Sequence, residues 1–376
     1  QFEGEGTAEK PYIIRTVDDL RTINKGITQN NLTYDGDFFE LANDLDFTGE
    51  TFYGVADDSN EKHAFNGVFD GKGHVIKNWK ISSIVTDADG KLDNKASRQS
   101  VGFFGIIGEN GVLKNLVMDS SCELKAGNGV AAFSAICKGR LENLRNHAAI
   151  TAAGNYAAGI VCRMAAGSVT DCYNDGAVTA GNRYAAGIVG QQMENVTVER
   201  CQNAGDISMA GITLTTPAAD TQTAAGIIAN NSGTGCVIRD CVNSGRIYAP
   251  QESAGIIGLI AGGTKVERCV NTGALEIGDP RKSFGAIAAL RAGVSEYVNC
   301  YYDASHHIYG AVYGDDMAGV TGLDTKTLVA GSFPEGLGTD AFDFSKDVYP
   351  VLKNFKDEAA VKALRGMWIN LSQGDV

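Results

Sequence analysis

The chain has 376 residues, 20% of them charged, and its formal net charge at pH 7 is −13. This acidic balance disfavours DNA, RNA or an anionic membrane as the main partner, because phosphate binding depends on clustered Lys and Arg. The longest apolar run, residues 254–261, is far shorter than the roughly 20 residues of a transmembrane helix, so we expect no membrane-spanning segment.

The first elements differ from everything that follows and have the features of a cap. Residues 11–14 predict a strand, and residues 16–23 predict a short helix with Thr16 as N-cap and Asp19 three positions later. Residues 38–46 and 67–76 resemble the strands of a first coil. We therefore expect residues 1–80 to form an N-terminal cap and first coil.

A short apolar block then returns seven times between Gly102 and Ala288, as in Gly187-Ile-Val-Gly190. The blocks begin about 26 to 39 residues apart, and such a period is typical of a solenoid whose repeats bury their apolar faces by stacking. The segments are short, rich in Val, Ile and Thr, and bounded by Gly and Asn, which favours strands. The sequence predicts an all-β, single-stranded, right-handed parallel β-helix of about 30 residues per coil, with its repeats in residues 101–303.

Two columns of residues recur in the second segment of the repeats. The first column holds Cys172, Cys201, Cys241, Cys269 and Cys300, and the second holds Asn174, Asn203, Asn243 and Asn271, each followed two positions later by Gly. We interpret the Cys column as a small buried apolar site. The Asn residues either have a left-handed backbone or stack as an amide ladder, and the Gly residues supply positive φ.

The nine cysteines are a second question, because an exported protein often carries disulfides. Equivalent Cβ atoms of stacked strands lie about 4.8 Å apart, beyond the roughly 3.5 to 4.5 Å of a disulfide. We expect mainly free, buried thiols, with some bridging, for example by Cys236, or a metal site as the alternatives. Zinc has little support, since no CxxC or Cys/His ligand spacing is present.

Aromatic residues are the candidates for ligand binding, since their rings combine a flat face with a hydrogen-bonding tip. These candidates are Tyr297, Tyr301, Tyr302, His306, His307 and Tyr309, where the repeats end, and Tyr156 and Tyr184, at two matching turns. Capping of the last coil and packing of the turns are the structural alternatives. The carboxylates of Asp171, Glu199, Asp240 and Glu267 are interpreted as solvated strand residues.

After the repeats, residues 304–376 are expected to form a C-terminal cap with a helix over residues 357–367. No Pro-rich or Ser-rich linker interrupts the chain, so we expect one β-helix domain over residues 1–376. The oligomeric state is open, with a monomer favoured.

The repeat Gly187-Ile-Val-Gly190 with its downstream Cys-x-Asn-x-Gly resembles the GLUG motif of bacterial surface proteins. The blocks at residues 39–46, 65–76, 323–328 and 349–352 are similar to the same group, so the resemblance covers roughly residues 9–353. That family includes adhesin-like proteins and the non-catalytic β-helical region of immunoglobulin A peptidase-like proteins. The resemblance implies an exported protein at the cell surface or outside a Gram-negative bacterium, and it implies no activity by itself.

Catalytic motifs are absent from the sequence. None of the five His opens an HExxH zinc-peptidase pattern, and no GxSxG elbow is present. We therefore expect no catalytic residue, no metal and no cofactor. The favoured hypothesis is non-enzymatic recognition or adhesion, with a host glycan or glycoprotein bound on an extended β-helix face. The alternatives are a carbohydrate-active β-helix enzyme and a structural spacer of a larger peptidase-like protein.

Overall fold

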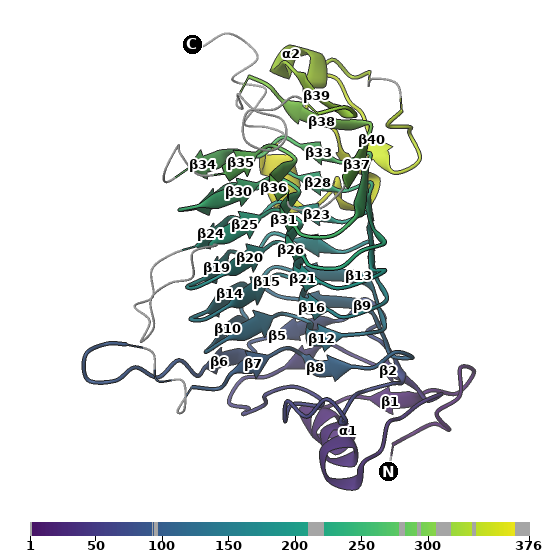
Figure 1. Ribbon diagram of the computed structural model, residues 1–376. Helices are drawn as coiled ribbons and strands as arrows, with labels where there is room; N and C mark the ends of the chain where they lie inside the picture. Colours follow the sequence, from purple (N-terminus) through teal and green to yellow (C-terminus); the bar gives the residue numbers. More distant parts are fainter. Residues whose placement is uncertain are drawn as a thin grey trace.

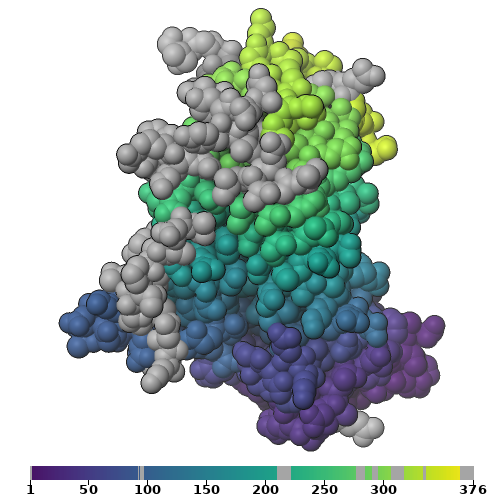
Figure 2. Space-filling view, in the orientation of Figure 1, coloured from purple at the N-terminus to yellow at the C-terminus, as the bar shows by residue number. Residues whose placement is uncertain are grey.

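The computed structural model describes residues 2–91, 93, 97–209, 222–277, 283–291, 295–305, 317–332 and 336–364. Parallel strands stack coil upon coil between an N-terminal cap and a C-terminal cap (Figure 1). The space-filling view follows the same order, from the purple N-terminal end to the green and yellow C-terminal end (Figure 2). The predicted all-β parallel β-helix is confirmed.

Each coil passes through four parallel sheets in turn. Sheet 1 has 18 strands among the described residues: β1 (Tyr12–Ile14), β2 (Phe38–Leu41), β3 (Leu45–Asp46), β4 (Val68–Asp70), β5 (Val75–Lys77), β9 (Val112–Met118), β13 (Arg140–Asn146), β17 (Ser168–Thr170), β18 (Tyr173–Asn174), β22 (Thr197–Glu199), β23 (Gln202–Asn203), β27 (Cys236–Arg239), β28 (Val242–Asn243), β32 (Thr264–Glu267), β33 (Val270–Asn271), β37 (Ser295–Val298), β38 (Cys300–Asp303) and β39 (Val320–Leu323).

The other three sheets have seven strands each in the described part of the chain. Sheet 2 contains β6 (Lys80–Ser82), β10 (Glu123–Ala126), β14 (Ala149–Ala152), β19 (Val178–Ala180), β24 (Ile207–Met209), β29 (Ile247–Ala249) and β34 (Leu275–Ile277). Sheet 3 contains β7 (Ser100–Val101), β11 (Gly129–Ala131), β15 (Tyr156–Ala158), β20 (Tyr184–Ala186), β25 (Thr223–Ala225), β30 (Glu252–Ala254) and β35 (Ser283–Gly285). Sheet 4 contains β8 (Phe104–Ile107), β12 (Ser134–Cys137), β16 (Val161–Met164), β21 (Val189–Gln192), β26 (Ile228–Asn231), β31 (Ile257–Ile260) and β36 (Ala288–Arg291).

The N-terminal cap closes the first coil with a helix and a cluster of aromatic rings. Helix α1 (Val17–Asn30) has the predicted N-cap, because Thr16 Oγ1 accepts from the Asp19 N–H and Asp19 accepts from the Thr16 N–H. The helix extends further than the sequence predicts, to the left-handed C-cap Asn31. Its buried Leu20, Ile23 and Ile27 belong to the same core as the solenoid.

A left-handed residue bends each coil of sheet 1 just before the buried Leu or Cys. The backbone φ lies between 49° and 56° at Asn115, Asn143, Asp171, Arg200, Asp240, Arg268 and Asn299. Asn and Asp tolerate this conformation better than most residues. At the two Arg positions, the side chain instead binds the Asp of the preceding coil, with Arg200 Nε 2.8 Å from Asp171 Oδ1 and Arg268 Nε 2.7 Å from Asp240 Oδ1.

The glycines after the Asn column serve a different purpose from the one predicted. Gly176, Gly205, Gly245 and Gly273 do not have φ in the left-handed region. A Cβ at Gly245 would lie 2.1 Å from the Gly205 carbonyl oxygen of the preceding coil, and the other three positions are similarly tight. These positions are therefore Gly because consecutive coils approach closely, and the prediction of positive φ is wrong.

The asparagines stack as an amide ladder inside the solenoid. The Nδ2 atom donates to the Oδ1 atom of the next coil from Asn146 to Asn174 (2.8 Å), Asn174 to Asn203 (2.9 Å), Asn203 to Asn243 (2.9 Å) and Asn243 to Asn271 (2.8 Å). A second Nδ2 bond closes a local turn, as from Asn203 to the Gly205 carbonyl at 2.9 Å. Each buried amide in the middle of the ladder thereby uses both of its N–H groups.

The cysteines are buried and free, and the thiols of the Cys column donate to backbone carbonyls, as from Cys241 to Arg239 at 3.2 Å. Burial raises the pKa of the Cys137 thiol to about 12 and that of Cys122 to about 11. Thiolate is the reactive form, so these groups are chemically inert packing residues in the folded chain.

The C-terminal cap covers both the end and one side of the solenoid. Strand β39 pairs with β38, helix α2 (Thr325–Leu328) follows it, and β40 (Phe342–Asp343) pairs antiparallel with β41 (Val351–Leu352). The short 3-10 helix η1 (Lys353–Phe355) precedes the predicted terminal helix, which is helical over residues 359–364, where the described residues end. We call residues 351–361 the C-terminal strap, because they pack on the outer face of sheet 1.

Candidate functional site

The tyrosines at the end of the repeats are buried by the C-terminal cap. Tyr297 and Tyr302 belong to the solenoid core, and they are 6% and 8% exposed. Tyr301 points to the outer face of sheet 1, where the C-terminal strap covers it and leaves 8% exposed. These positions correspond to the capping alternative. His306, His307 and Tyr309 lie outside the described residues.

The other predicted pair, Tyr156 and Tyr184, lies at equivalent positions of β15 and β20. The two ring centroids are 5.5 Å apart, with an angle of 33° between the planes. Tyr156 is half-buried and Tyr184 is buried. The rings pack on small residues of two different sheets, Ala186 of sheet 3 and Ala229 of sheet 4. The pair therefore marks the place where sheets 3 and 4 meet.

Sheets 3 and 4 meet at a corner where the backbone bends toward the interior of the solenoid. At this corner stand Gly159, Gly187, Gly226 and Gly255. A Cβ at Gly159 would lie 2.2 Å from the Gly187 carbonyl oxygen and 2.4 Å from Oδ1 of Asn174 in the amide ladder. Only Gly allows such an approach. The glycine that begins each of these apolar blocks thus contacts an Asn side chain of the amide ladder inside the solenoid.

The outer side of this corner is consequently concave, and small residues form its floor. Ala131 and Ala158 of sheet 3 pack against Cys162 of sheet 4, and Ala225 and Ala254 pack against Ala289. A Cβ at Gly258 of sheet 4 would lie 2.2 Å from Thr223 Cγ2 of sheet 3, which places the two sheets in contact across the floor. We call this concavity the corner groove.

Two columns of larger side chains form the walls of the corner groove. On sheet 3 the backbone register aligns Ser100, Gly129, Tyr156, Tyr184, Thr223 and Glu252. On sheet 4 it aligns Ile106, Ile136, Arg163, Gln191, Asn230 and Leu259. Ser100, Ile106 and Ile136 line one small pocket together, which shows that the two columns face each other. The backbone register places the later members of each column at equivalent positions of the following coils.

The N-terminal end of the corner groove is closed by a loop of the cap. The pocket there has a volume of about 30 Å³ and is also lined by Tyr53 and Asp57. The guanidinium of Arg98 lies 4.3 Å from the centre of the Tyr53 ring and binds Asp57 Oδ2 at 3.1 Å. This volume suits one or two water molecules rather than a sugar, so the pocket is the closed end of the groove.

The middle of the corner groove contains polar atoms without a partner. The guanidinium of Arg163 makes no hydrogen bond or ion pair with the described residues, and its Nε is buried. Oδ1 of Asn230 is likewise buried without a hydrogen bond to the part of the chain described, and the whole residue is 5% exposed. A buried polar group without a partner costs about 1–3 kcal/mol, so Arg163 and Asn230 are the residues at which an added hydrogen-bond partner would stabilise the groove.

A second polar cluster lies where the C-terminal strap crosses sheet 1. His147 Nδ1 is 2.6 Å from Asp175 Oδ1, and His147 Nε2 is 3.9 Å from Glu358 Oε2. Burial lowers the pKa of His147, but the hydrogen bond and charge of Asp175, with the charges of Glu358 and Asp119, outweigh it and raise the pKa. These three residues have ligand atoms within 4.8 Å of one another and could hold a metal ion.

The ion pairs of this cluster favour a structural role over a metal site. Glu358 already binds Arg145, and Asp175 accepts from the Tyr173 hydroxyl at 3.0 Å. The Arg145 guanidinium also lies 5.3 Å from the centre of the Phe355 ring. The cluster therefore fastens the C-terminal strap to the solenoid by charge and stacking.

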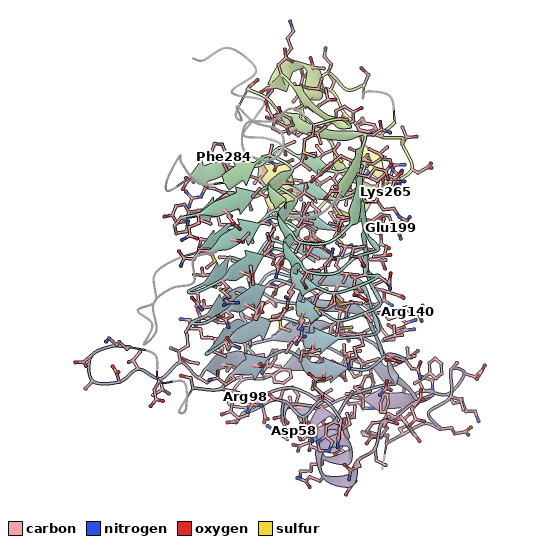
Figure 3. All side chains as sticks on the ribbon, in the orientation of Figure 1. Asp58, Arg98, Arg140, Glu199, Lys265 and Phe284 are labelled. Carbon is pink, nitrogen blue, oxygen red and sulfur yellow. The ribbon has the colours of Figure 1, made fainter. Side chains whose placement is uncertain are left out.

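The carboxylates next to the Cys column are held in ion pairs on the outer face of sheet 1. Arg200 binds Asp171 and Glu199, and Arg268 binds Asp240 and Glu267. Glu199 and Lys265 are labelled on this side in Figure 3, whereas Phe284 of β35 lies on the opposite side. The paired carboxylates stabilise neighbouring coils, so we assign them no catalytic role.

The sequence pointed to Tyr156 and Tyr184 but not to Arg163 or Asn230. The two missed residues follow the apolar blocks directly, at positions that hold Ile136 and Leu259 in other repeats. The available signal was a change from apolar to polar residues at one repeat position, since Arg163, Gln191 and Asn230 stand where the flanking repeats have Ile or Leu. The groove itself could not be predicted from the sequence, because its two walls come from different sheets and the repeat pattern does not show that they face each other.

Comparisons with known sequences give only partial matches. No family model matches the chain. Over 159 residues, 40% of the chain, it is 28% identical to halomucin of Haloquadratum walsbyi. Over 119 residues, 30% of the chain, it is 31% identical to a proposed Gly-rich membrane protein of Evansella cellulosilytica. The matched segments amount to 2% and 11% of these two relatives.

One solved structure shares the fold along almost the whole chain. The crystal structure of a proposed immunoglobulin A1 protease from Bacteroides ovatus matches 93% of this chain and 94% of its own, with a TM-score of 0.61 and 19% identity. At this identity the likeness establishes the fold alone. Within the described residues, no helix is both long and apolar enough to cross a membrane.

Proposed function

We propose that this chain is a recognition module of an exported bacterial surface protein, which binds a host glycan or glycoprotein in the corner groove and leaves it intact. The single observation that carries this proposal is the register-matched pair Tyr156 and Tyr184 above a floor of Ala and Gly. The half-buried ring of Tyr156 is suited to the apolar face of a sugar, and the tyrosine hydroxyl is suited to its hydroxyl groups.

The type of protein has separate support. The resemblance of the repeats to the GLUG motif favours a surface protein of a Gram-negative bacterium, and one relative is named as a membrane protein. The corner groove runs along several coils, so repeated weak contacts to one extended ligand raise the overall affinity. The absence of HExxH and GxSxG from the sequence favours binding over catalysis.

The test is an array of host glycans, mucins and immunoglobulins, with the bound ligand checked for cleavage by mass spectrometry. We expect saturable binding and an intact ligand. Tyr156→Ala should weaken binding about fivefold, since an aromatic contact contributes about 1 kcal/mol. Tyr248→Ala is the matched control, because Tyr248 is a half-buried tyrosine of sheet 2, away from the groove.

Three outcomes would contradict the proposal. A cleaved ligand would place the chain among carbohydrate-active or peptide-cleaving enzymes. Binding that Tyr156→Ala and Tyr248→Ala weaken equally would place the ligand outside the corner groove. No binding to any member of the array would favour a structural spacer.

A further inference from the structure

The chain is strongly acidic, and most of the arginines that the structure describes are paired with neighbouring carboxylates. Among the arginine side chains that the structure describes, ion pairs engage Arg15, Arg21, Arg98, Arg140, Arg145, Arg200, Arg239, Arg246 and Arg268. Arg163 and Arg183 make no ion pair with the described residues. Arg163 belongs to the sheet 4 wall of the corner groove, and Arg183 directly precedes Tyr184 of the sheet 3 wall.

The two free guanidinium groups lie beside the tyrosine pair. Arg163 belongs to β16, which follows the Tyr156 strand β15 in the same coil. Arg183 directly precedes Tyr184 and is exposed. Arg163 is set deeper, and its buried Nε has no acceptor in the described chain. A planar guanidinium in such a position is suited to a carboxylate or sulfate, which it binds with two parallel hydrogen bonds.

The nearest acidic groups along the groove are already occupied. Glu252 lies three coils beyond Tyr156, about 14 Å away at the usual strand spacing. It accepts a hydrogen bond of 2.6 Å from Thr223 Oγ1. At the other end, Asp57 is bound by Arg98. Asp57 is neutralised by Arg98, whereas Glu252 keeps its charge. Because Glu252 lies beyond the Debye length of about 8 Å at physiological ionic strength, its repulsion of an anion at Arg163 is weak.

The ligand must also reach Asn230. The register places Asn230 two coils from Arg163, which corresponds to about 10 Å. An isolated anion does not span that distance, whereas an oligosaccharide does, with a hydroxyl group donating to Asn230 Oδ1. Gln191 lies between the two and is half-buried, so it offers an amide to the same chain.

We propose that the ligand of the corner groove is an acidic oligosaccharide whose carboxylate or sulfate group binds Arg163, with a sugar ring against Tyr156 and a hydroxyl group on Asn230. This inference rests on the proposed function and names its ligand class. The acidic group supplies selectivity, because a carboxylate or sulfate forms a stronger, charge-assisted hydrogen bond with Arg163 than the hydroxyl group of a neutral sugar does.

The test measures the binding of sialyllactose, sulfated lactose and lactose to the wild-type chain, Arg163→Gln and Tyr156→Ala by calorimetry. The wild-type chain should bind at least one of the two acidic sugars about tenfold tighter than lactose, as expected for one charge-assisted contact. Arg163→Gln should reduce that affinity to the level of lactose, and Tyr156→Ala should weaken all three sugars. The preferred acidic sugar identifies carboxylate or sulfate as the source.

Arg140→Gln is the matched control, since Arg140 is an exposed arginine at the opposite side of the solenoid from β35 (Figure 3). If it reduces the acidic preference as much as Arg163→Gln does, net charge alone explains the preference and the inference fails. Equal binding of all three sugars that Tyr156→Ala weakens would overturn the inference and leave the proposed function standing. No binding of any of the three sugars to the wild-type chain would overturn the inference, and the array of glycans, mucins and immunoglobulins would then decide the proposed function separately.

Discussion

At the inward corner of each coil, Gly and Asn depend on each other. The corner glycine brings the backbone against the amide ladder, and the ladder fills the narrow interior where an apolar side chain would leave backbone groups without partners. Asn203 is an example, because it is fully buried and forms hydrogen bonds with Asn174, Asn243 and Gly205. Stability at this point therefore rests on hydrogen bonds rather than on apolar contact.

We expect Asn203→Ala to lower the free energy of unfolding by about 2–4 kcal/mol, because it leaves a buried donor on Asn174 and a buried acceptor on Asn243 without partners. Urea unfolding followed by circular dichroism measures the change. Asn30→Ala, at an exposed position at the end of α1, is the control and should cost little. A loss for Asn203→Ala as small as that of the control would show that the ladder does not stabilise the fold.

Among the elements, the C-terminal strap is attached to the solenoid by both stacking and charge. It crosses sheet 1 with Phe355 stacked on Tyr173 at 5.2 Å and with the Leu352 N–H donating to Gln202 Oε1 at 3.2 Å. Arg145, His147 and Asp175 of the solenoid and Glu358 of the strap form the charged contact, with Asp119 and Tyr173 beside it.

The strap should hold more tightly in mildly acidic solution. The pKa of His147 is raised above its ordinary value of 6.5, so the charged form is favoured in the folded state. This stabilisation is fully present below the unfolded pKa and is lost as the pH rises through the folded pKa. Hydrogen exchange at Leu352, corrected for the intrinsic rate, should be several-fold slower at pH 6 than at pH 8.5.

His147→Gln should remove this pH dependence while the strap stays folded on the apolar residues beneath it. The neutral amide keeps a hydrogen bond to Asp175 but carries no titrating charge. If the exchange rate at Leu352 varies with pH equally in both proteins, another group is responsible. That result would exclude His147 as the source of the pH dependence.

At the scale of the whole molecule, the two caps determine whether the ends of the solenoid are covered or are open to pairing with other chains. Helix α1 covers the first coil with Leu20, Ile23 and Ile27, and β39 pairs with the last long strand of sheet 1. Parallel strands whose edges are left open pair readily with other chains, and covered ends suppress this.

We expect the purified chain to be a monomer. Light scattering after size-exclusion chromatography should give the mass of a single 376-residue chain at micromolar concentration. A stable dimer or a concentration-dependent series of larger species would contradict the prediction. In that case, cross-linking would identify whether the ends of the sheets or the corner groove lies at the contact.

The sequence by itself determined the parallel β-helix, the N-cap at Thr16 and the columns of Cys and Asn. These features depend on a repeated local pattern, and stacking places equivalent residues of successive coils in register. The pattern misassigned the glycines after Asn, because close approach between coils and positive φ both favour Gly. A single sequence does not separate these two causes.

The tertiary structure alone decided the corner groove and the strap. The groove needs the inward corner to place Tyr156 of sheet 3 and Arg163 of sheet 4 on facing walls, and the strap brings together Arg145 and Glu358, which are 213 residues apart in the chain. The spacing of the repeats determines which residues stack, because equivalent strands of successive coils lie directly above one another. The direction in which the coil bends, and the segment that returns to cover it, depend on packing between distant residues.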